Sequence, residues 1–290
     1  MSLVVTSAAN ATIRRLKSLR MKKHRRSEGL FLAEGLRILV EALDAGRTPE
    51  ILLHAAGHEA HPLVARLVAA TVAAGGHVLA TTPAILAGVS GKDNPQMVLG
   101  AYREIASGLD ALRLSAGRIV AAERLRDPGN LGTLLRACDG AGAGGLVLLE
   151  SSTDPFSVEA VRASMGAIFT VPVAQSSADA FLAWARRAGV ALLGAALVEG
   201  ALDYREARFP SPCCILLGNE QQGLPAGLVA ACDACVAIPM LGRADSLNVA
   251  MAGTLLLYEA LRRQQPPGQA RRAPSACGAA GRRRRASPGR

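Results

Sequence analysis

The first hundred residues show two kinds of hydrophobic pattern that alternate along the chain. Short runs of consecutive apolar residues predict buried strands at 29–35, 50–55, 77–82 and 96–104. Between them, apolar residues that recur every three or four positions predict helices at 36–46 and 61–75. Gly46 ends the first of these helices and Pro62 lies in the first turn of the second, as is common at helix ends. The pattern predicts a small α/β layer.

After a connector at 106–117, the alternation starts again and continues to residue 263. Apolar runs predict strands at 118–123, 145–150, 169–173, 190–197, 213–220 and 235–240. Helical spacing predicts helices at 130–142, 158–166, 178–189 and 246–263. Strands that are apolar throughout and alternate with helices are typical of a parallel sheet covered on both faces. We therefore expect an α/β fold for this part as well.

Composition narrows the class of protein. Half of the 290 residues are hydrophobic, yet no apolar run reaches the about 20 residues of a membrane helix. The opening MSLVVTSAAN lacks a cationic segment followed by an apolar one, so no secretory signal is indicated. We expect a cytoplasmic protein without a membrane partner. Six cysteines include one CxxC pair but no second pair at zinc-site spacing, so we expect free, structural thiols and no metal.

The net charge of +10 is concentrated at the two ends of the chain. Residues 1–27 and 265–290 together carry +15 and no acidic residue, so residues 28–264 sum to −5. Basic segments attract polyanions because each neutralised phosphate releases counterions. The candidates for nucleic-acid binding, with a merely solvated surface as the alternative, are Arg14, Arg15, Lys17, Arg20, Lys22, Lys23, Arg25 and Arg26. The tail at 265–290 lacks apolar periodicity, and we expect it to be disordered.

The segment DPGNLGTLLRACDGAGA at 127–143 raises the question of a nucleotide-binding loop. A dinucleotide fingerprint needs GxGxxG directly between a strand and a helix. Here the turn after the strand carries GNLG, the later GAGAGG precedes a strand, and GxxxxGK[ST] does not occur. We therefore expect neither a Rossmann site nor a P-loop. Asn130 is either a helix cap or a functional amide, and Arg136 is either a rim side chain or a functional cation.

Two further loops place polar residues at the ends of predicted strands. LLGNEQQGLP at 216–225 contains Gly218 and Glu220, and IPMLGRADSLNVA at 238–250 places Ser246 and Asn248 before the last helix. Open parallel sheets bind ligands at the carboxyl ends of their strands. Glu220, Ser246 and Asn248 are therefore candidates for a site, with simple caps and turn residues as the alternative.

Together and in this order, three segments resemble the motifs of the SpoU/TrmH family of SPOUT-class RNA methyltransferases: DPGNLGTLLRACDGAGA, ILLGNEQQGLP and IPMLGRADSLNVAMAGTLLLYEAL. FLAEGLRILVEAL resembles the RNA-binding domain, similar in fold to ribosomal L30e/L7Ae proteins, that precedes the catalytic domain in many members. The resemblance implies a parallel sheet with a deep C-terminal trefoil knot. It also implies that the protein is a homodimer. The implied parts are an RNA-substrate domain at 1–105, a linker at 106–117, a methyltransferase domain at 118–264 and the tail.

The resemblance also implies a reaction, in which S-adenosylmethionine methylates a ribose 2′-hydroxyl of structured RNA, preferentially ribosomal RNA. The residues it implies for the cofactor are Gly218, Ile238, Met240, Leu241 and Leu247. Those it implies for the reaction are Asn130, Arg136, Glu220, Ser246 and Asn248, the last three orienting Arg136 and the nucleotide. With a pKa above about 12, arginine is a poor base, so we expect Arg136 to clamp a phosphate and stabilise alkoxide charge. The alternatives are a transfer-RNA methyltransferase and a non-enzymatic RNA-binding protein.

Overall fold

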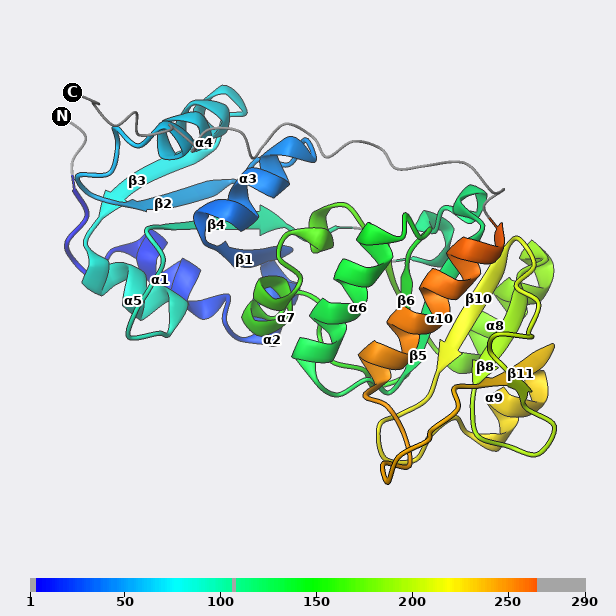
Figure 1. Cartoon of the computed structure of the whole chain (residues 1–290). Helices are drawn as coiled ribbons and strands as arrows, with labels where there is room; N and C mark the ends of the chain where they lie inside the picture. Colours follow the sequence, from blue (N-terminus) through cyan, green and yellow to red (C-terminus); the bar gives the residue numbers. More distant parts are fainter. Residues whose placement is uncertain (1–3, 106–107, 265–290) are drawn as a thin grey trace, which may run out of the picture.

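The computed structural model describes residues 4–105 and 108–264, which form two sheets with helices around them (Figure 1). The first sheet has four strands in the order β1-β4-β2-β3. Its strands are β1 (Leu30–Glu34), β2 (Ile51–Ala55), β3 (His77–Thr81) and β4 (Val98–Arg103). β4 runs antiparallel to β1 and β2, whereas β2 and β3 are parallel. All four predicted strands are confirmed, and they form a mixed sheet.

Five helices surround this first sheet. They are α1 (Ala11–Ser18), α2 (Lys22–Glu28), α3 (Leu36–Asp44), α4 (Pro62–Ala73) and α5 (Pro83–Ser90). α5 is not among the predicted helices, because eight residues are too few to show a clear period. It is set up locally by Pro83 in its first turn and by Thr82, whose hydroxyl accepts a hydrogen bond of 3.3 Å from the Ile85 amide.

The second sheet has seven strands in the order β7-β6-β5-β10-β8-β11-β9, and every pairing is parallel. Its strands are β5 (Arg118–Glu123), β6 (Leu146–Leu149), β7 (Val173–Ser176), β8 (Ala191–Ala195), β9 (Leu202–Asp203), β10 (Cys213–Leu217) and β11 (Ala234–Ala237). The predicted parallel sheet is confirmed. The predicted strand at 169–173 is wrong, because Ala167–Phe169 forms a 3-10 turn and β7 begins only at Val173.

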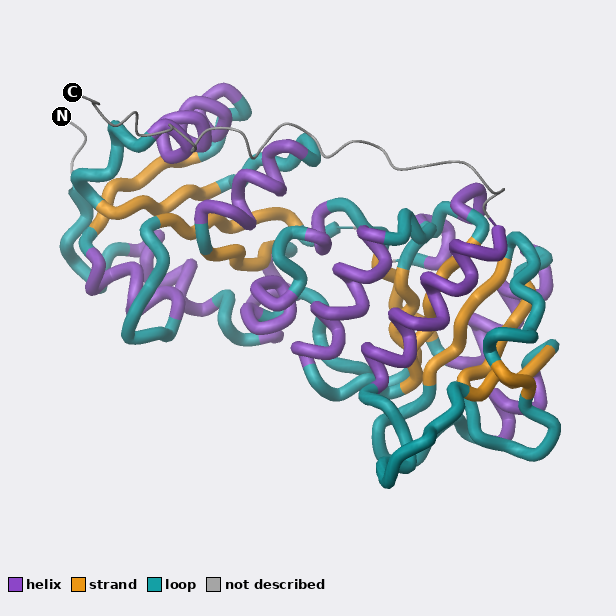
Figure 2. The backbone as a smooth tube through the Cα atoms, in the orientation of Figure 1, coloured by secondary structure: helices purple, strands orange, loops and turns teal. Residues whose placement is uncertain are grey.

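Helices cover both faces of the second sheet, as Figure 2 shows. They are α6 (Pro128–Gly140), α7 (Val158–Ala163), α8 (Ala178–Ala188), α9 (Ala226–Ala231) and α10 (Val249–Gln264). Alternate strand residues point to opposite faces. Val120 and Ala122 of β5 therefore share a core with α6 and α10, whereas Ile119 and Ala121 share one with α8 and α9.

The two sheets are joined by a continuous apolar core and a buried ion pair. The ring of Phe31 in β1 lies 4.9 Å from that of Phe156 and 5.7 Å from that of Phe169, centroid to centroid. Nearby, Arg25 Nη2 lies 2.6 Å from the Asp154 carboxylate, and the Arg25 side chain is only 3% exposed. Arg25 is therefore a structural cation, and the prediction that it contacts RNA is wrong because its charge is committed to Asp154.

Three further predictions concern membrane helices, the cysteines and the tail. No helix in the described parts of the chain is both long and apolar enough to cross a membrane. Five cysteines are free thiols, and burial raises the pKa of the Cys138 thiol to about 12, which keeps it in the unreactive protonated form. Cys277 and the tail at 265–290, predicted to be disordered, lie outside the described residues.

Candidate functional site

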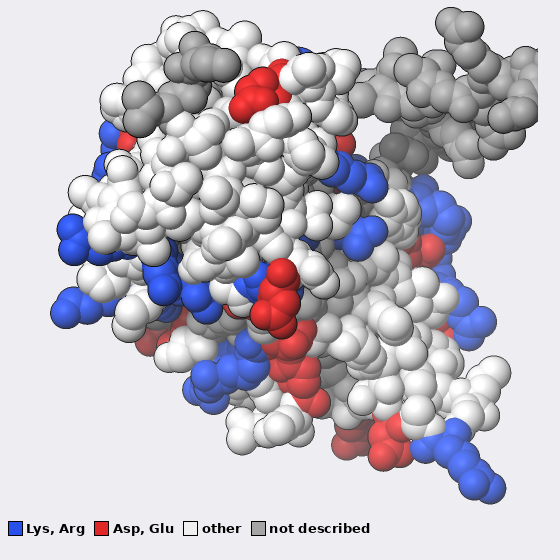
Figure 3. Space-filling model, turned by 90° about the vertical axis from the view of Figure 1, so that its left-hand side faces the viewer, with Lys and Arg blue, Asp and Glu red and all other residues white. Residues whose placement is uncertain are grey.

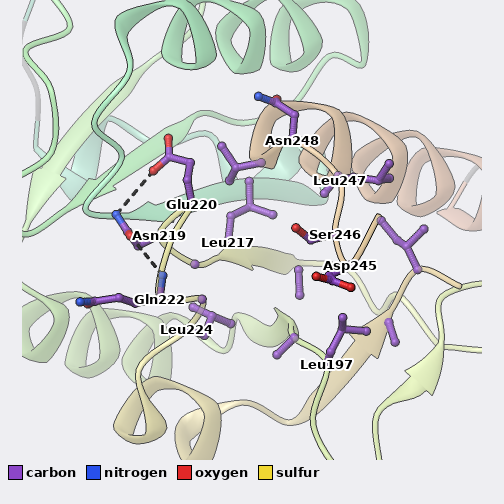
Figure 4. Close-up of a pocket in the computed structure, with 18 of the residues that line it drawn as sticks. Leu197, Leu217, Asn219, Glu220, Gln222, Leu224, Asp245, Ser246, Leu247 and Asn248 are labelled. Carbon is purple, nitrogen blue, oxygen red and sulfur yellow. Dashed lines mark hydrogen bonds between the residues drawn. The ribbon is translucent and has the colours of Figure 1, made fainter. Parts of the chain in front are cut away.

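Three loops meet at the carboxyl ends of β8, β10 and β11, which are neighbours in the sheet. Together they enclose a cavity of about 570 Å³ (Figure 4). Its walls come from residues 195–198 at the end of β8, 217–224 at the end of β10, and parts of 236–252 around β11 and the start of α10. Cavities of about 300–1,000 Å³ are typical of small-molecule sites.

Gly218 lies where the loop after β10 folds back on itself. A Cβ atom here would lie 2.2 Å from the carbonyl carbon of Gly223 and 2.3 Å from the amide nitrogen of Leu224. Two backbone hydrogen bonds of 3.1 and 2.9 Å between Asn219 and Gly223 close the loop. Glycine at 218 is therefore required by the approach of the loop's own backbone, a reason that differs from the expected approach of a ligand.

The loop between β11 and α10 carries the remaining residues predicted for the cofactor. Ile238, Met240 and Leu247 line the cavity together with Gly218. Leu241 does not line it and is 99% exposed. The structure thus brings four of the five predicted residues to one cavity and leaves Leu241 outside it.

A chain of side-chain hydrogen bonds connects the three sequence motifs. The Asn130 amide donates to Glu220 Oε1 over 3.2 Å, and the Asn248 amide donates to Asn130 Oδ1 over 2.9 Å. Asn248 also caps α10, because its Oδ1 accepts from the Ala250 amide over 2.9 Å. α6 is capped by Asp127, whose carboxylate accepts from the Asn130 backbone over 2.6 Å. The helix-cap interpretation of Asn130 is therefore wrong, and its side chain is free to join the other two motifs.

Ser246 and Arg136 complete the set of residues predicted for the reaction. Ser246 lines the cavity together with Glu220 and Asn248. Arg136 is exposed on α6, about 9 Å along the helix axis from Asn130 at 1.5 Å per residue, and it does not line the cavity. No hydrogen bond or ion pair to the Arg136 side chain occurs among residues 4–105 and 108–264. Within one chain, Glu220, Ser246 and Asn248 therefore do not hold Arg136 as expected.

Several cavity residues were not predicted. Ala195 ends β8 and residues 196–198 follow it, although 196 and 197 were predicted as part of that strand. Leu224 follows the folded-back loop. Asp245 also lines the cavity, next to Ser246 in the chain (Figure 4). Its carboxylate is an acceptor for ammonium or hydroxyl donors of a ligand. The sequence feature that could have identified Asp245 was its position next to Ser246 in the third motif.

The end of β5 places a buried carboxyl group next to the cavity loops. Glu123 is 2% exposed, and this burial raises its pKa, although Arg124 opposes the shift from 3.1 Å. Arg124 has a φ of +45°, and its carbonyl accepts a hydrogen bond of 3.0 Å from the Asn219 side chain. The turn after β5 is therefore tied to the loop after β10.

The basic residues predicted to bind RNA lie away from this cavity, on α1, α2 and their connection. Apart from Arg25, all are exposed: Arg14, Arg15, Lys17, Arg20, Lys22, Lys23 and Arg26. Arg15 is paired with Glu28. In the described part of the chain, no group of three or more His, Cys, Asp or Glu side chains is arranged to hold a metal ion.

Comparison with known proteins links both parts of the chain to RNA methyltransferases. Residues 117–258 match the SpoU rRNA Methylase family, and residues 10–100 match the MRM3-like substrate binding domain. The chain is 31% identical over 267 residues to the 23S rRNA (uridine(2479)-2′-O)-methyltransferase of Streptomyces viridochromogenes, covering 89% of this chain and 92% of that protein. It is 28% identical over 255 residues to the 23S rRNA (guanosine(2553)-2′-O)-methyltransferase RlmP of Bacillus subtilis (strain 168), covering 88% and 97%.

A solved structure agrees with the sequence relatives. The AdoMet-bound rRNA methyltransferase from Sinorhizobium meliloti is 40% identical, with a TM-score of 0.84 over 91% of this chain and 99% of that one. Both the first sheet and the second sheet with its cavity fall within this similarity, because so little of either chain is left out. The chain belongs to the SpoU rRNA methylase family.

Proposed function

We propose that this protein transfers a methyl group from S-adenosylmethionine to a ribose 2′-hydroxyl of ribosomal RNA in the cytoplasm. The observation that carries the proposal is the hydrogen-bonded chain of Glu220, Asn130 and Asn248 beside the cavity. Two relatives that align along most of the chain are named 23S rRNA 2′-O-methyltransferases, which favours ribosomal over transfer RNA. In this proposal residues 1–105 contact the RNA and residues 118–264 hold the cofactor and the reaction.

The cavity suits S-adenosylmethionine in size and chemistry. The bound cofactor supplies an electrophilic methyl group on a sulfonium. Leu197, Ile238 and Leu247 offer apolar walls, and Asp245 offers a carboxylate to the cationic and hydroxyl groups of the cofactor. The close packing of Gly218 against Gly223 holds the wall after β10 in one shape, which lowers the ordering cost of binding.

The RNA side of the site is assigned to Asn130 and Arg136. A ribose hydroxyl is a poor nucleophile, so the enzyme must align it and stabilise the charge that develops on its oxygen. Alignment alone is worth about 7–11 kcal/mol. Glu220 and Asn248 fix the Asn130 amide beside the cavity, while the fork of Arg136 clamps a neighbouring phosphate. The proton leaves to a phosphate oxygen or to water.

We also propose a homodimer that forms through the outer face of α6 and α10. Met251, Leu255 and Tyr258 lie on one stripe of α10 and are 63%, 36% and 45% exposed, and such apolar stripes are typical of interfaces. Gly140, four residues after Arg136 on α6, faces Tyr258, since a Cβ there would lie 2.8 Å from its hydroxyl. Dimerisation through this face would bring Arg136 to the cavity of the second copy.

The resemblance also implies a knot, which we propose for the path into α10. The segment 238–248 shares one cavity with the loop 218–224, and α10 then packs back on β5 and β10 in the middle of the sheet. If the chain passes through its own loop on this path, it forms a trefoil, a topology that is rare in proteins. Stretching single molecules from both ends would leave a knotted chain measurably shorter than its full contour length.

The central experiment combines cofactor binding with methylation mapping. We expect saturable binding of S-adenosylmethionine in calorimetry and, in cells lacking the gene, the loss of one 2′-O-methyl group from 23S rRNA. Loss of a 2′-O-methyl group from transfer RNA alone would identify transfer RNA as the substrate. If the protein bound no cofactor and no methyl group were lost, the non-enzymatic RNA-binding protein would be the remaining alternative.

Mixed dimers test the role of Arg136. Arg136→Ala and Asn130→Ala are each expected to be inactive, and unfolding and refolding them together should restore activity in the mixed dimers. Arg136→Lys keeps the charge but loses the fork. Near-normal turnover of Arg136→Lys would refute the clamp, and no recovery in the mixture would place Arg136 in the site of its own chain.

A further inference from the structure

A second hollow, of about 710 Å³, lies between α1, the end of α5 and α7. It is distant in sequence from the cofactor cavity and shares no residue with it. Its charged lining residues are Arg14, Lys17, Arg20, Lys92, Glu159 and Arg162. Five cations therefore face this cleft, hereafter the α1–α7 cleft, against a single acid.

Among residues 4–105 and 108–264, most of these cations have no ion-pair partner. Lys92 pairs with Glu34 over 3.2 Å. In the described residues no ion pair neutralises Arg14, Lys17, Arg20 or Arg162. Figure 3 shows Lys and Arg side chains gathered at the height of α1 and α5, with fewer charges at the height of α4. Cations held around one hollow repel one another until a polyanion enters, because the low-dielectric walls concentrate their field.

The walls of the cleft are built to keep these cations in place. The Arg20 guanidinium rests against Gly91 at the end of α5, where a Cβ would lie 2.4 Å from it. Nη1 of buried Arg25 donates hydrogen bonds of 2.9 and 2.8 Å to the Leu19 and Arg20 carbonyls, and Nη2 pairs with Asp154. Arg25 thus fixes the end of α1 to the same part of the chain that carries α7.

The α1–α7 cleft lies close to the residues assigned to the reaction. α6 and α7 pack so tightly that a Cβ on Gly132 would lie 2.3 Å from that of Ala163. Gly132 follows Asn130 by two residues and Ala163 follows Arg162 by one, so at 3.8 Å per residue the Asn130 and Arg162 backbones are at most roughly 17 Å apart. A single stretch of RNA therefore reaches both places.

We propose that the α1–α7 cleft binds the phosphate backbone of the substrate RNA next to the modified nucleotide. The RNA lies across the junction of the two sheets, gripped by Arg14, Lys17 and Arg20 from one side and by Arg162 from the other. The few aromatic residues in the chain, 3%, favour phosphate contacts over base stacking. The choice of RNA as the polyanion rests on the proposed function.

The test measures binding of unmodified 23S rRNA, transcribed in vitro, by the full chain as salt is raised from about 50 to 200 mM KCl. Arg14→Ala/Lys17→Ala/Arg162→Ala should lower the slope of log affinity against log salt by about 2–3, since each phosphate contact contributes about 0.7–0.9. The matched control is Arg186→Ala/Arg187→Ala/Arg208→Ala, which removes three exposed arginines outside the cleft. The control should keep the slope of the natural protein.

Arg162→Ala alone tests the bridging geometry. It should raise the KM for RNA several-fold, change kcat less, and leave S-adenosylmethionine affinity and Tm as they are. An unchanged KM and slope for Arg162→Ala would overturn the cleft and leave RNA binding to α1 and α2. Equal competition by duplex DNA would overturn the assignment to RNA.

The readouts also separate this inference from the proposed function. If the triple variant had a reduced salt slope but the natural protein showed no methyl transfer and no cofactor binding, the proposed enzyme activity would be refuted and RNA binding by the cleft supported. If the natural protein transferred methyl groups but the triple variant kept its salt slope, the enzyme activity would be supported and RNA binding by the cleft refuted.

Discussion

Gly218→Ala tests whether the folded-back loop after β10 shapes the cofactor cavity. The new methyl group would lie 2.2 Å from the backbone of Gly223, whereas ordinary contacts begin at 3.4 Å, so the loop must withdraw by the difference of about 1.2 Å. A shift of this size breaks the two hydrogen bonds between Asn219 and Gly223. At about 0.5–1.5 kcal/mol each, losing both hydrogen bonds makes the folded-back shape of the loop about 1–3 kcal/mol less stable than in the natural protein.

This cost should appear in cofactor binding. Because residues 218–224 line the cavity, closure is needed for binding, and about 1–3 kcal/mol weakens S-adenosylmethionine affinity about 5- to 150-fold. Isothermal calorimetry measures the Kd, and thermal unfolding without cofactor shows whether the fold is intact.

Gly227→Ala is the matched control for this substitution. Gly227 lies nearby in α9, and a Cβ there meets nothing within 4 Å. Alanine also favours the helix by about 1 kcal/mol, so this variant should bind the cofactor normally. If Gly218→Ala bound it with unchanged affinity as well, the loop would not control the cavity.

Three further predictions concern stability. Asn248→Ala removes the cap of α10 and should cost about 1 kcal/mol in urea unfolding, with a lower kcat, whereas Asn248→Asp should keep the cap. Two arginines in the last turn of α10 lower the pKa of Glu259 to about 2, below its usual 4.5. The stabilisation of the fold by Glu259 is therefore complete above pH 4.5 and lost as pH falls toward 2. Glu259→Gln should flatten that part of a plot of unfolding free energy against pH. Arg25→Met should lower the free energy of unfolding by about 3–5 kcal/mol because it leaves Asp154 unpaired. Adding Asp154→Leu to Arg25→Met should recover part of this loss.

The positions of the secondary structures were readable from local pattern. Apolar runs and helical spacing depend on neighbours a few residues apart, so the strand at 118–123 and the helix that carries Asn130 could be predicted. The strand predicted at 213–220 was also found, although it ends at Leu217. Short elements escaped, such as α5 and α9, because six to eight residues hold too little periodicity. The polar loops after β10 and β11 were predicted to lie together, because parallel strands end at one edge of their sheet.

The tertiary structure decided what each side chain touches. Asn130 became a link to Glu220 and Asn248 because Asp127 already caps α6. Arg25 does not share the exposure of the other basic residues of α1 and α2 because Asp154, 129 residues away, pairs with its charge.

The close approaches and the second basic surface were also decided by packing. Gly218 is required by its own loop, and Arg162 joins the basic residues of α1 across the junction of two sheets. The sequence alone determined which elements form and which chemistry they carry, since both depend on residue type and local spacing. Contacts between residues far apart in the chain leave no mark in local spacing, so only the folded structure could assign partners, burial and accessible charge.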